Sequence, residues 1–178
     1  MLKLFDEKEL TDCGIILEDV INYAVDGWNL GVTHGLKHWL RVERNGLLLA
    51  EAGNVNRKVV RLFAILHDHK RFDDWMDSDH GQRAADALYG IRNTLLKGLE
   101  EEEFSLLYRA CSIHTHVNRT GDPTIDACLD ADKLDLLRCG IRPDPNRMAT
   151  ELGVFYAKQL RFDENYLDQL CEARERKA

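Results

Sequence analysis

Residues 59–71 read VVRLFAILHDHKR. Apart from Arg61, the first eight positions are apolar on nearly every face of a helix, which is typical of a helix buried inside a small domain. The run then ends in five ionisable residues, from His67 to Arg71. An imidazole or carboxylate in an apolar site is strongly disfavoured unless it is paired, hydrated or bound to a metal. The simpler alternative is a helix that reaches the surface and ends in solvent.

The length and charge of the chain narrow the kinds of protein it can encode. Its 178 residues suffice for one domain with a substantial core, and its apolar content of 44% is ordinary for a globular protein. The formal net charge of -7 argues against a general nucleic-acid-binding surface. An anionic ligand would therefore need a local group of cations that opposes the charge of the whole protein.

The cysteines indicate a reduced, cytoplasmic protein. They are odd in number, widely spaced and set among apolar residues without a C-x-x-C pair, so we expect free thiols in the core. The apolar start, residues 1–5, is too short for a signal peptide, and no apolar run approaches transmembrane length. The cysteines are Cys13, Cys111, Cys128, Cys139 and Cys171.

The spacing of apolar residues predicts an all-α fold, one compact multi-helix bundle over residues 1–178. No stretch alternates between apolar and polar residues in the manner of a β-strand. Asn56 is placed to cap the buried helix, and Thr150 and Asp163 to cap two closing helices at about 150–176. The remaining helices are predicted over residues 11–26, 34–52, 80–97, 101–115 and 124–139.

Several polar residues fall on the core-facing stripes of these helices. In the helix over 124–139, Asp132 continues the apolar stripe, whereas Asp130 falls on the outer face with Asp126 and Lys133, and Asp135 lies on the flank. A carboxylate on a core-facing stripe needs a strong partner.

Histidines occupy equivalent inward positions in other helices. His114 continues the stripe of its helix, His80 lies one turn before an apolar stripe, and His34 and His38 share a face. One core-facing histidine is more often a hydrogen-bonded core residue than a ligand, but a single divalent-metal centre would satisfy all of these groups together. Imidazole and carboxylate donors suit several ions, and Mn, Fe, Zn, Mg, Co and Ni are not distinguished. The inward set is His38, His67, Asp68, His80, His114 and Asp132.

This ordered set resembles the signature of the HD superfamily of metal-dependent phosphohydrolases, namely a distal His, a His-Asp pair after an apolar helix, and a distant Asp. Two further matches resemble the extra histidines of two-metal members, and the resemblance as a whole covers roughly residues 34–140. Parts of it look like a small bacterial branch of HD proteins that implies no particular substrate. The matching segments are HWLRV at 38–42, LHD at 66–68, DHGQRAA at 79–85, IHT at 113–115 and DADKLD at 130–135.

The resemblance implies a metal-dependent phosphohydrolase that cleaves a phosphate ester, with nucleotides among the candidates, through metal-activated water. His38, His67, Asp68 and Asp132 would hold one ion. A second ion would take the two remaining histidines and share Asp68. Two alternatives stay open: an HD-type di-iron oxygenase, and a non-catalytic regulatory module that the metal stabilises.

The same comparison suggests roles for neighbouring residues. Asp68 and Asp135 are the catalytic candidates, with Asp135 or Asp79 as general base, and His34 would orient a ligand. Cations near the ligands would bind a small anionic substrate, although a solvated surface charge explains each one equally well. Lys133 is predicted to point outward, and His69 to contact phosphate or lie at the surface. The preferred phosphate contacts are Arg83 and Arg71, followed by Lys70 and Arg41.

Overall fold

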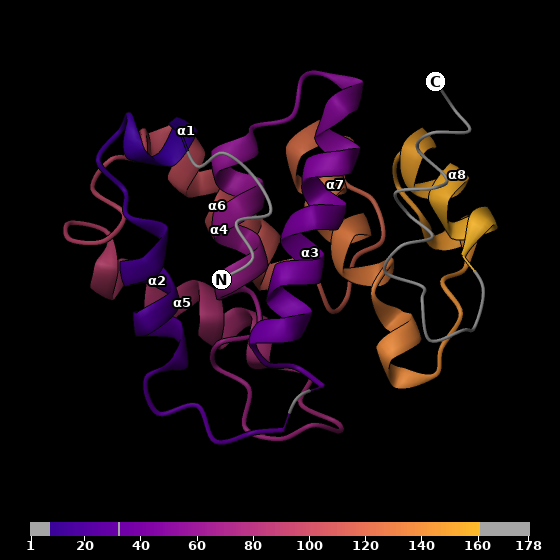
Figure 1. Cartoon of the computed structure of the whole chain (residues 1–178), viewed down its shortest axis with the longest axis horizontal. Coiled ribbons are helices and arrows are strands. Elements are labelled where there is room, and N and C mark those ends of the chain that lie inside the picture. Colours follow the sequence, from indigo (N-terminus) through magenta and orange to yellow (C-terminus); the bar gives the residue numbers. More distant parts are fainter. Residues whose placement is uncertain (1–7, 32, 161–178) are drawn as a thin grey trace.

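The structure is a computed structural model, and it describes residues 8–31 and 33–160 (Figure 1). All regular secondary structure in these ranges is helical, which confirms the all-α class. The α-helices are α1 (Lys8–Thr11), α2 (Leu17–Val25), α3 (Leu36–Leu49), α4 (Arg57–Leu66), α5 (His80–Ile91), α6 (Glu101–Ile113), α7 (Pro123–Lys133) and α8 (Glu151–Gln159). Short 3-10 helices lie at η1 (Ala50–Ala52), η2 (Leu136–Cys139) and η3 (Pro145–Arg147).

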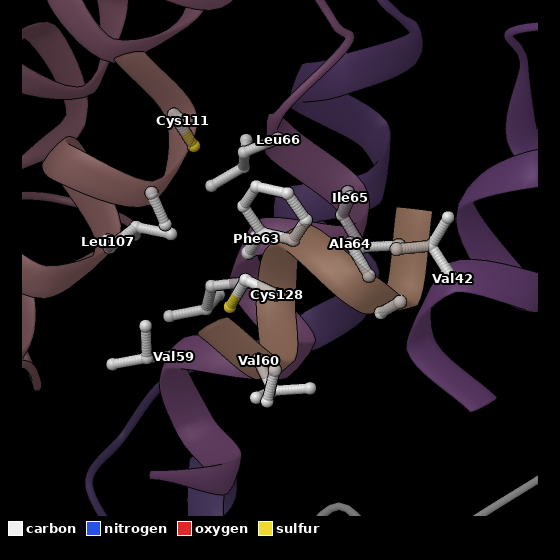
Figure 2. Close-up of a cluster of buried hydrophobic side chains, with 14 of the residues drawn as sticks. Val42, Val59, Val60, Phe63, Ala64, Ile65, Leu66, Leu107, Cys111 and Cys128 are labelled. Atoms are coloured by element: carbon white, nitrogen blue, oxygen red, sulfur yellow. The ribbon is translucent and has the colours of Figure 1, made fainter. Parts of the chain in front are cut away.

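Helix α4 lies at the centre of the bundle and contacts α2, α3, α6 and α7. Phe63 at its middle is completely buried, and Figure 2 shows it surrounded by Leu107, Cys111 and Cys128 from neighbouring helices. The side chain of Asn56 accepts a hydrogen bond from the backbone N–H of Val59 at 3.1 Å, as the sequence predicted. The apolar run therefore forms a central helix.

The polar end of this helix is also buried. His67 has no exposed surface, Asp68 is 2% exposed and His69 is 6% exposed. The alternative in which the helix surfaces and ends in solvent is therefore wrong, and these ionisable groups need partners inside the protein.

The prediction that Asp130, Asp126 and Lys133 lie on the outer face of α7 is wrong, because all three side chains are buried. The segment that leads into α8 covers this face. The carboxylate of Asp130 accepts hydrogen bonds from the backbone N–H of Ala149 at 2.8 Å and of Thr150 at 2.8 Å. The spacing of apolar residues in a helix does not reveal polar contacts on its other face. For this reason α7 is buried on more faces than its apolar stripe indicated.

Several predicted helices are shorter than expected. The helix predicted over 11–26 begins only at Leu17, because a turn in which Gly14 adopts a φ of +79° separates α1 from α2. The helix predicted over 124–139 ends at Lys133, and the chain continues through a turn into η2. Likewise α3 gives way to η1, and α5 ends at Ile91 rather than at residue 97.

The closing helix and the cysteines agree only in part with expectation. Thr150 caps α8 through its side chain, which accepts the N–H of Gly153 at 2.9 Å. Asp163 and the second closing helix lie outside the described residues, as does Cys171.

The described cysteines lie partly in the core. Cys111 and Cys128 are buried and Cys13 is half-buried. Cys139 is exposed at the end of η2, so the prediction that it lies in the core is wrong.

Within the described ranges, every helix is too short or too polar to cross a lipid bilayer.

Candidate metal centre

Five helices bring the six predicted metal ligands to one place. His38 lies on α3, His67 and Asp68 directly follow α4, and His80 begins α5. His114 follows the last residue of α6, and Asp132 lies near the end of α7. Their donor atoms form three overlapping sets, within each of which all atoms lie within 4.8 Å of one another. The sets are His38 with His67 and Asp68, His67 with His114 and Asp132, and Asp68 with His80 and His114.

The first four ligands have separations that suit a single ion. His38 Nε2 lies 3.1 Å from His67 Nε2, 3.6 Å from Asp68 Oδ2 and 3.4 Å from Asp132 Oδ1. His67 Nε2 lies 3.7 Å from Asp68 Oδ2 and 3.8 Å from Asp132 Oδ1. A tetrahedral ion with bonds of about 2.0–2.1 Å holds its donor atoms roughly 3.4 Å apart. Five of the six separations among these four donor atoms therefore suit such an ion.

Asp68 divides its two carboxylate oxygens between two groups of histidines. Its Oδ2 atom faces His38 and His67, whereas its Oδ1 atom lies 2.9 Å from His80 Nε2 and 3.6 Å from His114 Nε2. His80 Nε2 and His114 Nε2 are themselves 2.9 Å apart. Asp68 therefore links two pairs of histidines, one pair at each of its oxygens.

The second nitrogen of each ligand histidine has a partner that fixes its protonation. Nδ1 of His38 donates to Asp135 at 2.7 Å, and Nδ1 of His114 donates to the carbonyl of Cys111 at 2.8 Å. Nδ1 of His67 donates to the carbonyl of Phe63 at 3.1 Å, and Nδ1 of His80 donates to the carbonyl of Asp77. Carboxylate and carbonyl oxygens only accept, so each neutral imidazole carries its proton on Nδ1. When these imidazoles are neutral, their Nε2 lone pairs therefore point into the cluster.

The inner surface of the cluster is rich in acceptors, and Arg71 Nη1 and Arg138 Nη2 are donors at its edge, 3.1 Å from His80 Nε2 and 3.7 Å from Asp132 Oδ1. Asp132 Oδ1 is buried and has no hydrogen-bond partner within the described residues. An unsatisfied buried carboxylate oxygen beside imidazole lone pairs is costly unless a cation is present. The residues of this chain therefore fit a divalent metal, and nitrogen and carboxylate donors suit ions such as Zn²⁺, Mn²⁺ and Fe²⁺.

Burial and charge set the protonation of the ligands. Burial lowers the pKa of His67 to about 3 and also lowers that of His38, which keeps both imidazoles neutral. Burial opposes ionisation of Asp68, but His67 and hydrogen bonds from other histidines hold its pKa well below the usual range. For His114 burial is outweighed by the hydrogen bond and charge of Asp68, which raise its pKa. Asp68 therefore favours positive charge at the position of His114.

Other residues fix the geometry of the ligands. Asp135 is completely buried behind His38 and also accepts from Arg41 Nε at 2.6 Å. His34 Nδ1 lies 3.1 Å from Asp68 Oδ2, where it can orient that carboxylate. A Cβ atom on Gly81 would lie 2.6 Å from the carbonyl of Cys111, so glycine allows α5 and α6 to approach closely beside the cluster.

A cavity of about 470 Å³ opens next to the cluster. Asp68, His80, His114 and Asp132 line it, and so does His34. It has the size of an ordinary small-molecule site, which spans roughly 300–1,000 Å³. The metal ligands therefore lie at the inner end of a space that a substrate can enter.

Of the four cations predicted to contact phosphate, only Arg71 lines this cavity. Arg83 pairs with Asp77 and donates to the carbonyl of Lys70 at 3.1 Å. Arg41 is bound to the buried carboxylate behind His38, and the ammonium of Lys70 lies 5.3 Å from the ring of Tyr23. The placements of these three residues do not support direct substrate contact.

The proposed general bases and His69 also lie away from the cavity. Asp135 has no exposed surface and is absent from the cavity wall, and Asp79 is exposed outside it. His69 is buried rather than at the surface, with Nδ1 donating to the carbonyl of Leu66 at 2.6 Å. Asp135 is therefore placed to position His38 rather than to take a proton from water.

Four cations of the cavity wall were missed or misplaced by sequence reasoning. Lys133, predicted to point outward, lines the cavity and is only 9% exposed. Arg138 was not considered, although it follows Asp135 by one turn and lies 3.7 Å from Asp132 Oδ1. Arg142 and Arg147 flank the predicted Pro143–Pro145 turn, and only the folded chain shows that this turn borders the cluster.

No family model, curated protein or solved structure matches this chain, so the assignment of the centre rests on its own geometry.

Proposed function

We propose that this protein is a metal-dependent phosphohydrolase of the HD type that cleaves a phosphate ester. One observation carries the proposal: a buried cluster of histidines and aspartates with the separations of metal ligands lies at the inner end of a cation-lined cavity. Two of these cations approach the ligand carboxylates. Arg71 Nη1 lies 3.6 Å from Asp68 Oδ1, and Arg138 Nη2 lies 3.7 Å from Asp132 Oδ1.

Each group of residues has a defined task in this proposal. His38, His67, Asp68 and Asp132 hold one ion, while His80 and His114 share Asp68 to hold a second. A divalent ion supplies Lewis acidity and lowers the pKa of a coordinated water toward neutrality.

The remaining residues act on the substrate or on the ligands. The guanidinium groups of Arg71 and Arg138 are placed to bind the oxygens of a phosphate that enters the cavity, because planar guanidinium pairs well with phosphate. Asp135 and Arg41 hold the ring of His38 in the tautomer that keeps its Nε2 lone pair free. Both arginines would stabilise charge on the departing group.

The di-iron oxygenase is the second candidate, and the position of Asp68 fits it as well as the hydrolase. A carboxylate with one oxygen on each histidine pair suits a dinuclear centre, which both two-metal hydrolases and di-iron oxygenases use. The cations of the cavity do not separate the two, because an oxygenase of this kind also binds anionic substrates.

The test starts from protein purified without chelators, whose metal content is measured first. A panel of phosphate esters is then screened with the protein loaded with Mn, Fe, Zn, Mg, Co or Ni in turn, with His67→Ala as the inactive control. We expect phosphate release that requires metal and is lost in the control. Oxygen consumption with iron alone, without phosphate release, would replace the hydrolase by the oxygenase. Tightly bound metal without either activity would favour the regulatory module.

A further inference from the structure

Residues 138–147 form a stiff segment along one wall of the cavity, which we call the arginine arch. Its arginines, Arg138, Arg142 and Arg147, all line the cavity. The arch includes Gly140 in a left-handed turn, with a φ of +72°, and two prolines around Asp144. The side chain of Asp144 caps η3 by accepting the N–H of Asn146 at 2.9 Å. Fixed φ angles and a capped turn reduce the freedom of the backbone that carries the arginines.

Both ends of the arch are anchored to elements of the metal centre. Arg138 Nε donates to the carbonyl of Thr33 at 2.9 Å, beside His34. At the other end, Asp130 on α7 accepts the N–H of Ala149 at 2.8 Å, two residues after Arg147. Because α7 also carries Asp132, the arginines are held in a fixed relation to the metal ligands.

The arginines of the arch are of two kinds. Arg138 contacts the ligand carboxylate of Asp132, which places it beside the metal centre. Arg142 and Arg147 form no hydrogen bond or ion pair with any side chain in residues 8–31 and 33–160. Both are exposed along the cavity wall. The outer arginines are thus available to a ligand.

Lys133 adds a third outer cation, and it is nearly buried. Its Nζ atom donates to the carbonyl of Asn118 at 3.2 Å and lies 3.5 Å from Asp130 Oδ1. Like charges gathered on one wall repel each other, and the arrangement gains stability when an anion binds between them.

Most acidic residues of the wall have partners elsewhere. Asp68 and Asp132 belong to the metal centre, Asp77 pairs with Arg83, and Asp144 accepts the N–H of Asn146. The whole protein has a net charge of -7, so a cluster of cations here runs against its overall composition.

We propose that Arg142, Arg147 and Lys133 form a second anion subsite. The ligand of the cavity would then carry two anionic groups joined by a spacer. One group is a phosphate at the metal centre, and the other is a phosphate or carboxylate at the arch. The identity of the first group rests on the proposed function, whereas the second subsite rests on the arch alone. A cavity of about 470 Å³ leaves space for the spacer as well as for one phosphate.

The test uses the full chain loaded with Zn²⁺, which has no redox chemistry of its own. The probes are α,ω-alkane bisphosphonates with two to six methylene groups and alkyl monophosphonates of equal length, whose C–P bonds resist hydrolysis. Affinities are measured by titration calorimetry for wild type and for Arg142→Gln/Arg147→Gln. The matched control is Lys97→Gln/Arg109→Gln, which removes two exposed charges outside the cavity wall.

We expect wild type and the control to bind a bisphosphonate of one preferred length at least about tenfold more tightly than the monophosphonate. The arch variant should lose this preference and keep its monophosphonate affinity. Equal affinity of wild type for both probes would overturn the proposal, and so would a preference that survives in the arch variant. Equal weakening of both probes in that variant would also overturn it, because the arginines would then act only through their long-range field.

Failure of the arch proposal and failure of the phosphohydrolase proposal would give different results in this experiment. No probe is turned over, so absence of phosphatase activity leaves the length preference unaffected. Monophosphonate binding that does not depend on Zn²⁺ would count against the metal centre, whereas loss of the length preference alone would count against the arch. Circular dichroism and melting curves of both double variants establish that they are folded.

Discussion

The Nε2 atoms of His38 and His67 face each other at 3.1 Å, and both nitrogens present lone pairs because both Nδ1 atoms donate elsewhere. Two lone pairs at this distance repel each other, and Asp132 Oδ1 adds a third acceptor at 3.4 Å from His38. A fold that places three acceptors together loses stability there unless a cation is bound. Four predictions and a concluding measurement follow from this relationship and from the contacts around it.

Asp132→Asn should have opposite effects on the metal-free and metal-loaded protein. Without metal, the substitution removes a half-buried carboxylate whose buried Oδ1 atom lacks a hydrogen bond, so stability should stay equal or rise. With metal, wild type should be the more stable form, because bound ligand stabilises the native state. Urea denaturation with and without chelator measures both differences, and a clear loss of stability in the metal-free variant would contradict the account.

Asp130→Asn is the matched control, two residues away on the same helix. Asp130 is completely buried and its carboxylate accepts hydrogen bonds from the backbone of Ala149 and Thr150. Its replacement should lower the free energy of unfolding by about 3 kcal/mol with or without metal, because hydrogen bonds to a charged group are lost. Its metal content should remain that of wild type.

Asp135→Asn should weaken metal binding without removing a ligand. The carboxylate holds the Nδ1 proton of His38, and an amide cannot enforce this tautomer. Loss of such a partner typically costs a factor of about 10–100 in metal affinity. Competition with a chromophoric chelator measures the affinity. Activity lost at saturating metal, with unchanged affinity, would instead restore Asp135 as a general base.

Arg138 and Arg83 should differ in their effects on catalysis. Arg138 lines the cavity beside Asp132, so Arg138→Gln should lower kcat/KM by at least about tenfold on a confirmed phosphate ester. Arg83 is paired with Asp77 and donates to the carbonyl of Lys70, so Arg83→Gln should mainly destabilise the loop before α5. A larger kinetic effect from Arg83→Gln, with full stability, would return that residue to the substrate site.

The metal-free protein should lose stability as the pH falls from about 6.5 to 4. Burial lowers the pKa of His69 from 6.5 to about 4, so in this range the unfolded chain binds a proton that the folded protein does not. Each such proton contributes up to about 1.4 kcal/mol per pH unit. Denaturation curves at several pH values should show a shallower slope for His69→Gln than for wild type, and equal slopes would argue against a neutral buried His69.

The sequence was sufficient to predict the fold class and to single out, as candidate metal ligands, six residues that the structure brings together. Helical spacing places His38, Asp132 and His114 on inward faces, and local periodicity reports such faces directly. The His67-Asp68 pair follows a run that is apolar on nearly every face, but this run also allowed a helix that ends in solvent, and the inward histidines of other helices were needed to favour a buried pair. These are properties of single helices, and they do not depend on how the helices pack.

The errors concern contacts between segments that lie far apart in the chain. Asp130 was assigned to the outer face because nothing in its helix shows that the backbone at Ala149 covers it. Arg142 and Arg147 lie around a turn, where helical spacing says nothing about the direction of a side chain. Only the folded arch shows that they line the cavity. Arg83 was preferred for its position three residues after His80, but a nearby aspartate, Asp77, pairs with it.

The central claim is that the cluster holds two metal ions, with Asp68 shared between them. The most direct test is metal stoichiometry: protein is stripped with chelator, titrated with the metal found after purification, and analysed for metal per chain. Wild type should take up two equivalents, the second more weakly, and His80→Ala and His114→Ala should each stop at one. Wild type that stops at one equivalent, or variants that still take up two, would contradict the account.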